Sequence, residues 1–164
     1  MSTSLPQVAH ERHDHIVAGV DRLPAAADRL LASPGPEAVA ALEETASFLD
    51  RELLPHIEIA ETALYPELER MYQNRHSMAP MRREHAEIRR LVGVLSAMTE
   101  DARGKGLSLG RVLAIRRVLF TLYAMLKIHL AEEEAYLRVI EHGVTEDVAD
   151  LIAATMAVAS VDAG

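Results

Sequence analysis

The sequence predicts an all-α protein, an antiparallel up-down-up-down four-helix bundle with a short C-terminal helix. Good helix formers dominate its 164 residues, and aromatic residues make up only 4%. Apolar residues recur at steps of three and four over long stretches, which is the period of amphipathic helices. Turn signals are few and widely spaced, and long helices joined by short links favour an antiparallel bundle.

Clusters of Gly, Pro, Asn and Ser divide the chain into its predicted elements. They lie at residues 33–36, 73–80, 103–110 and 142–143. The stretches between them predict helices over about 7–32, 37–72, 81–102 and 111–141. Pro55 and Pro66 interrupt the second of these and remove backbone donors, so we expect a kink or break there. A tail helix over about 146–159, with Thr145 as its N-cap, is expected to cover one end of the bundle.

The composition indicates one soluble domain and excludes several classes of protein. A length of 164 residues suits a single domain over 1–164, with its core at about 8–142. The absence of cysteine excludes disulfides, thiolate zinc sites, iron–sulfur clusters and a cysteine nucleophile. A formal charge of −8 argues against nucleic-acid binding, because the phosphate backbone favours positively charged proteins.

Neither a membrane span nor a secretion signal is expected. The sequence contains no run of about 18 apolar residues. Its first residues, Met1 to Pro6, lack the basic region and following apolar stretch of a signal peptide. The expected compartment is therefore the cytoplasm.

Each of the four long helices carries one histidine on its apolar face. The histidines are His13, His56, His85 and His129, and Glu133 follows His129 by one helical turn. Residues four apart lie about 40° apart around a helix, so His129 and Glu133 can point at one place. A buried histidine is costly unless its nitrogens find partners, and a metal bound between the helices would satisfy all four. Imidazole and carboxylate ligands suit iron, zinc, copper or manganese.

A single histidine on an apolar face is better interpreted as a structural residue than as a metal ligand. One histidine on each of four apolar faces, with a carboxylate in register, favours a metal site instead. These faces run from His13 to Leu30, from Leu42 to Leu64, from Met81 to Leu95 and from Ile115 to Ile140.

The remaining histidines are expected to be solvated, with one exception. His76 lies in a predicted turn, His142 lies at a helix end, and His15 points away from the stripe of His13. His10 lies about 60° from His13 on an ideal helix and is a substitute ligand.

Four motifs follow one another along the chain: Glu11-Arg12-His13, Leu53-Leu54-Pro55-His56 with Glu61-Thr62-Ala63-Leu64-Tyr65-Pro66, Met81-Arg82-Arg83-Glu84-His85, and His129-Leu130-Ala131-Glu132-Glu133-Glu134. In order and spacing, these motifs resemble the hemerythrin family, specifically its bacterial HHE cation-binding type. The resemblance covers residues 8–142 approximately. It implies a non-haem di-iron centre inside an up-down-up-down bundle. The irons would be bridged by two carboxylates and an oxygen species, with one iron open to dioxygen.

The chain departs from the family pattern at two places. The family has His-x-x-x-Glu in its second helix, but the fourth residue after His56 is Ala60. Glu61 lies about 100° further round an ideal helix, so it reaches the centre only if the helix is distorted, as its prolines would allow. Animal hemerythrins also carry a second histidine in the third helix, where this chain has Met81 and Arg89.

The expected metal ligands are His13, His56, Glu61, His85, His129 and Glu133. Without Glu61 the set suits one metal and is small for two, because bridging carboxylates offset the repulsion between two divalent ions. Tyr65, at core spacing, is interpreted as a packing residue, with a hydrogen bond to the centre as the alternative. The neighbours of Glu133 in the acidic run are expected to be solvated. The arginines are expected to form weak surface ion pairs.

These features predict a non-haem iron protein, di-iron or mono-iron, that binds or senses dioxygen, nitric oxide or peroxide. Zinc or manganese is the alternative metal. A second hypothesis is an iron-dependent enzyme that consumes peroxide or oxidises a small substrate. A third is a degenerate bundle with zinc or no metal that acts as an interaction module. The expected partner is a small diatomic ligand or peroxide, not nucleic acid or a membrane, and the expected state is a monomer or weak homo-oligomer.

Overall fold

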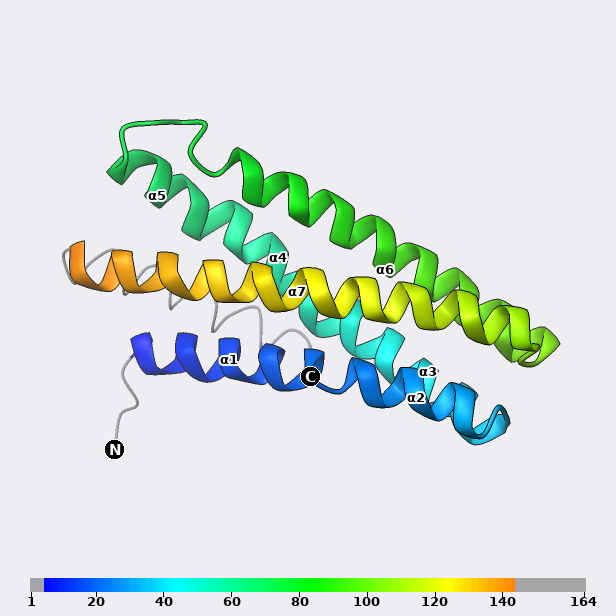
Figure 1. Ribbon diagram of the computed structural model, residues 1–164. Coiled ribbons are helices and arrows are strands. Elements are labelled where there is room, and N and C mark those ends of the chain that lie inside the picture. Colours follow the sequence, from blue (N-terminus) through cyan, green and yellow to red (C-terminus); the bar gives the residue numbers. More distant parts are fainter. Residues whose placement is uncertain (1–4, 144–164) are drawn as a thin grey trace.

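The computed structural model describes residues 5–143, and the side chains of residues 12–138. This part of the chain is helical apart from short links and contains no strand, as the sequence predicts. Four helical segments follow one another, and the colours of Figure 1 show successive segments running in opposite directions. The tail helix predicted over about 146–159 lies outside the described residues.

The first segment consists of two helices, α1 (Leu5–Val20) and α2 (Leu23–Ala32), where the sequence predicted one. Pro24 lies in the first turn of α2 and has no N–H to donate to the preceding turn. The break at Asp21 and Arg22 is therefore the local effect of this proline. The pattern of apolar residues continues across the break, so the sequence predicts a single helix here.

The second segment contains the kinks that its prolines predict. It comprises α3 (Pro36–Phe48), the π-turn η1 (Leu49–Leu53), α4 (Leu54–Ile59), the π-turn η2 (Ala60–Leu64) and α5 (Tyr65–Met71). Each π-turn is followed within two residues by a proline, Pro55 or Pro66. A π-turn is wider than an α-turn and holds an extra residue, so it changes the direction in which the following side chains point.

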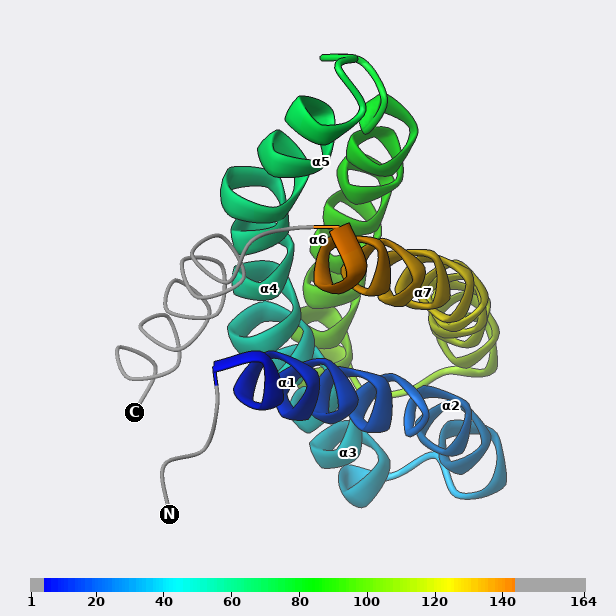
Figure 2. The ribbon, with the colours of Figure 1, turned by 90° about the vertical axis from the view of Figure 1, so that its left-hand side faces the viewer.

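The third and fourth segments are single long helices, α6 (Ala79–Lys105) and α7 (Leu109–Gly143). Helix α7 packs along both α2 and α6, and Figure 2 shows the four segments in a view along α7. Among residues 5–143, no helix combines the length and the apolar composition needed to cross a lipid bilayer.

The apolar faces predicted from the sequence form the core. Their members with described side chains are buried, except for Tyr136, which is half-buried. The core has two apolar clusters, one toward Leu95 and Leu119 and a smaller one around Leu64 and Leu68. Along α6 and α7 the histidines lie at the junction between these clusters.

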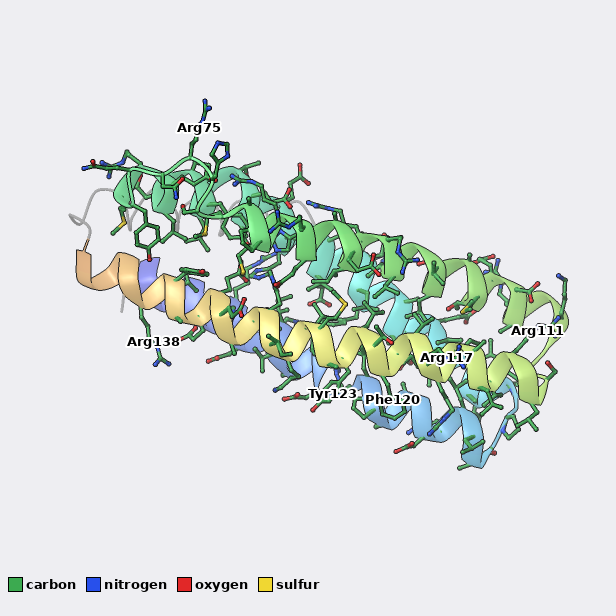
Figure 3. The ribbon with its side chains drawn as sticks, turned by 45° about the horizontal axis from the view of Figure 1, so that its top comes forward. Arg75, Arg111, Arg117, Phe120, Tyr123 and Arg138 are labelled. Atoms are coloured by element: carbon green, nitrogen blue, oxygen red, sulfur yellow. The ribbon has the colours of Figure 1, made fainter. Side chains whose placement is uncertain are left out.

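Surface arginines pair with nearby acids, as expected. Arg90 pairs with Glu87 on the same helix, and Arg116 of α7 pairs with Asp28 of the adjacent helix α2. Figure 3 shows Arg75 and Arg138 pointing away from the bundle into solvent.

We predict that Gly19→Ala lowers the free energy of unfolding by about 1–3 kcal/mol. A methyl group at this position would overlap the ring of Phe48, which packs against α1. Gly93→Ala is the matched control, because apart from its chain neighbours and the backbone of its own helix, no atom lies within 4 Å of the methyl group it adds to α6. That change is expected to raise stability by about 0.5–1 kcal/mol. Urea denaturation of both variants measures the difference, and equal effects would contradict the close approach at Gly19.

Candidate metal centre

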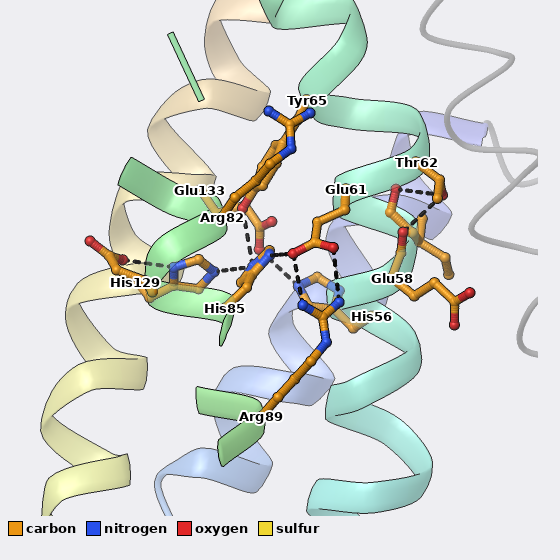
Figure 4. Close-up of polar contacts among 12 residues, drawn as sticks. His56, Glu58, Glu61, Thr62, Tyr65, Arg82, His85, Arg89, His129 and Glu133 are labelled. Atoms are coloured by element: carbon orange, nitrogen blue, oxygen red, sulfur yellow. Dashed lines mark hydrogen bonds and ion pairs between the residues drawn. The ribbon is translucent and has the colours of Figure 1, made fainter. Parts of the chain in front are cut away.

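Three predicted ligands converge in the centre of the bundle (Figure 4). His85 comes from α6, while His129 and Glu133 come from successive turns of α7. One donor atom from each lies within 4.8 Å of the other two, and all three side chains are buried. The Nε2 atoms of His85 and His129 are 2.8 Å apart.

Two carboxylates on the outer side of these histidines define their tautomers. Nδ1 of His85 donates to Oε1 of Glu61 over 2.8 Å. Nδ1 of His129 donates to Oε2 of Glu84 over 3.0 Å. A neutral imidazole carries one proton, so both Nε2 atoms carry lone pairs, and these lone pairs face each other. Together with the carboxylate of Glu133 they form an electron-rich group of atoms, to which a cation is complementary.

Glu133 connects this group to the histidines of the first two segments. Its Oε2 accepts a hydrogen bond from Nε2 of His56 over 2.8 Å. The ring of His13 lies beside that of His56, with 6.0 Å between the ring centroids. Nδ1 of His13 lies 3.4 Å from Oε2 of Glu134. The four histidines and Glu133 are thus one continuous cluster contributed by all four segments.

The residues of this cluster fit a bound transition metal. Within the described part of the chain, Nε2 of His13 and Oε1 of Glu133 are buried and have no hydrogen-bond partner. A buried polar atom without a partner costs about 1–3 kcal/mol. Both atoms are of types that bind transition metals, and both belong to the cluster that contains the facing lone pairs. Metal binding would therefore satisfy the atoms that the protein itself leaves unsatisfied.

Burial and mutual contact keep these side chains in the protonation states that metal binding requires. Burial first, and the neighbouring His129 second, lower the pKa of His85 to about 4. Burial also lowers the pKa of His13. Burial raises the pKa of Glu133, but the surrounding histidines, His56 first, outweigh it and hold the pKa at about 2. At neutral pH His13 and His85 are therefore neutral and the carboxylate of Glu133 is charged.

Tyr65 belongs to the same group of atoms, although the sequence analysis interpreted it as a packing residue. Its hydroxyl donates to Nε2 of His85 over 3.1 Å, and the side chain is fully buried. On a straight α-helix, Tyr65 would point about 180° away from His56, nine residues earlier. The π-turn η2 lies between them and rotates Tyr65 toward the centre. The sequence signal for this placement is the spacing of nine residues between His56 and Tyr65, together with Pro66 directly after Tyr65.

Glu61, the remaining carboxylate among the expected ligands, lies beside His85 and outside the group of three donors that converge. It was predicted to supply a metal-binding oxygen, but its carboxylate lies on Nδ1 of His85, opposite the nitrogen that faces His129. Arg89 holds it there through two hydrogen bonds of 2.9 Å. Burial raises the pKa of Glu61, but the hydrogen bonds from Arg89 and His85 outweigh it, so its net pKa is lowered.

Glu84 and Glu134 were missed as partners of the histidines. Glu134 was expected to be solvated, but it is only 25% exposed and faces His13. Glu84 directly precedes His85 in the sequence but contacts His129 of α7. Glu134 directly follows Glu133 but contacts His13 of α1. Only the packing of the segments reveals these contacts.

Other histidines lie outside the centre. His15 is exposed and pairs with Glu52, and His76 is exposed in the link before α6. The side chains of His10 and His142 lie outside the described part, so His10 stays a candidate ligand from sequence alone.

Buried histidine and carboxylate donors contributed by four helical segments define a metal-binding helical bundle. A family model described as the hemerythrin HHE cation binding domain matches residues 7–137, and a second match covers residues 79–156. The chain belongs to this hemerythrin family. Searches of curated proteins and of solved structures gave no significant match.

We predict that the metal-free protein loses stability as the pH falls from 6.5 to about 4. Above pH 6.5 the ring of His85 is neutral in both the folded and the unfolded state. Below it the unfolded state binds the proton first, so the free energy of unfolding decreases, by on the order of 3 kcal/mol for this residue. Urea denaturation of chelator-treated protein between these pH values measures the slope. His85→Gln is expected to flatten it, and an unchanged slope would contradict the role of His85.

Proposed function

We propose that this protein is a non-haem iron protein whose buried centre binds or senses a small ligand such as dioxygen, nitric oxide or peroxide. The observation that supports this most is the pair of Nε2 lone pairs of His85 and His129, which face each other 2.8 Å apart beside a buried carboxylate. The family of the chain and the unpartnered atoms of His13 and Glu133 support it further.

In this proposal His85, His129 and Glu133 would hold a first metal. These are the three residues whose donor atoms already lie within 4.8 Å of one another. The phenol oxygen of Tyr65 is a fourth donor. Burial raises the pKa of Tyr65 in the absence of a cation. A bound cation reverses this preference, because it stabilises the phenolate.

His13 and His56 would hold a second metal, and Glu133 lies between them and the first group of donors. Oε2 of Glu133 lies 2.8 Å from Nε2 of His56, and its Oε1 has no partner among the described residues. A carboxylate with one oxygen free and the other beside a second histidine suits a bridge between two cations. Glu133 would thereby supply the shared carboxylate that Ala60 cannot supply.

The environment of the centre favours a small ligand. The four histidines are between 0% and 5% exposed, so a large substrate has no direct contact with them. The protein donors of this proposal are also too few to fill two metals. Iron, when bound, supplies a redox-active centre with positions open to a diatomic molecule or peroxide. The protein would contribute the histidines, the carboxylate of Glu133 and the exclusion of bulk water, and we propose that it acts in the cytoplasm.

We predict that His85→Ala and His129→Ala each remove most of the bound metal while the protein stays helical. Each change deletes one of the two facing nitrogens, whereas the apolar clusters on either side remain. His76→Ala is the control, because that histidine is exposed. Elemental analysis of protein prepared with iron gives the metal content, and circular dichroism gives the helix content. Full metal content in both variants would disprove the proposed site.

We predict that the ferric protein shows a phenolate-to-iron charge-transfer band in the visible range, and that Tyr65→Phe abolishes it. The hydroxyl of Tyr65 lies 3.1 Å from Nε2 of His85, so the same iron can bind both atoms. Tyr72→Phe is the control, because Tyr72 is 44% exposed. A band that persists in Tyr65→Phe would show that Tyr65 is not a ligand, and would leave the histidine site untouched.

A further inference from the structure

Arg89 lies one helical turn after His85 on α6, and both side chains contact the carboxylate of Glu61 (Figure 4). Nη1 and Nη2 of Arg89 donate to Oε1 and Oε2 of Glu61, both over 2.9 Å. Oε1 also accepts the hydrogen bond from Nδ1 of His85 over 2.8 Å. One carboxylate oxygen is therefore shared between the guanidinium group and the histidine.

We propose that Arg89 is a positioning residue for the metal centre, because it holds Glu61 on Nδ1 of His85 and so keeps Nε2 directed at the metal. The inference rests on the proposed function, since it concerns how tightly that metal is held. Carboxylate partners on the outer nitrogen of a ligating histidine fix its tautomer and strengthen its binding to metals. Arg89 acts one step further out, through Glu61.

Glu61 needs such an anchor because of where it lies. It belongs to the π-turn η2 and is 24% exposed, so its carboxylate has access to solvent. A bound metal would also attract it, which would remove it from His85. The guanidinium group is a planar fork that matches both carboxylate oxygens, so it fixes their orientation as well as their position. A lysine at this place would supply the charge without the second hydrogen bond.

A neighbouring ion pair, Arg90 with Glu87, shows how the Arg89–Glu61 pair differs from an ordinary surface pair. Arg90 follows Arg89 directly on α6. It donates to Glu87 of the same helix through two hydrogen bonds of 2.8 and 2.6 Å. The side chains of Arg90 and Glu87 are both exposed. Exposed pairs of this kind contribute little to stability. Arg89 and Arg90 therefore have the same chemistry, but only Arg89 is connected to a buried histidine.

The test is a titration of the full-length protein with cobalt(II), followed by its visible absorption and by competition with a chromophoric chelator. The variants are Arg89→Met, Arg89→Lys, Glu61→Gln and the double variant Arg89→Met/Glu61→Gln, with Arg90→Met as the matched control. Circular dichroism and thermal melting of the metal-free variants check that the bundle is intact.

We expect Glu61→Gln to weaken cobalt(II) binding about 10- to 100-fold. Arg89→Met is expected to weaken it about tenfold, Arg89→Lys less, and Arg90→Met not at all. Because Arg89 acts through Glu61, the double variant is expected to bind like Glu61→Gln alone.

Wild-type affinity in Arg89→Met, or additive effects in the double variant, would overturn the positioning role. The positioning role would also be overturned if Arg89→Met and Arg89→Lys both melted well below the wild type in the metal-free form. Lost folding would then explain their weaker cobalt(II) binding. Failure of the wild-type protein to bind cobalt(II) or iron would instead disprove the proposed function, so the two failures are distinguishable.

Discussion

Two imidazole nitrogens face each other across 2.8 Å in the interior of this bundle, and both carry lone pairs. The protons that would relieve this contact are on the opposite nitrogens, where Glu61 and Glu84 accept them. Beside the pair lies a charged carboxylate, Glu133, which is 1% exposed. Tyr65 donates to Nε2 of His85 and His56 donates to Glu133, but Oε1 of Glu133 and Nε2 of His13 have no partner among the described residues. A cation would compensate these atoms and the close contact between the two nitrogens, because buried charges and lone pairs need compensation. Apolar clusters on both sides provide the stability that holds it in place.

The helices set the geometry of this contact through their periodicity and through one local irregularity. Steps of three and four bring His85 into line with the apolar residues of α6, and the step of four brings Glu133 into line with His129. The second segment departs from this rule at η2, where a π-turn takes up an extra residue. That turn carries Glu61 to the outer side of His85 and directs Tyr65 at its inner side. Ala60, where the family carries a carboxylate, is fully buried in this turn.

The helices and the buried histidines could be predicted from the sequence, because both depend on local periodicity. The break before Pro24 could not be placed, since the apolar pattern runs through it. The roles of Glu61, Glu84 and Glu134 could not be predicted either, because each depends on which histidine of another segment lies opposite. Tyr65 was misjudged for a different reason: its direction depends on the phase of the helix after a π-turn, and the sequence indicates only that a distortion occurs there.

The measurement that tests this account most directly is the number of metal ions per chain in wild-type protein prepared with iron and purified without chelators. A centre built on two groups of donors that share Glu133 predicts close to two irons per chain. One iron per chain would confine the site to His85, His129, Glu133 and Tyr65 and contradict the second position. No bound iron, zinc or manganese would contradict the central claim that the facing nitrogens of the bundle bind a cation.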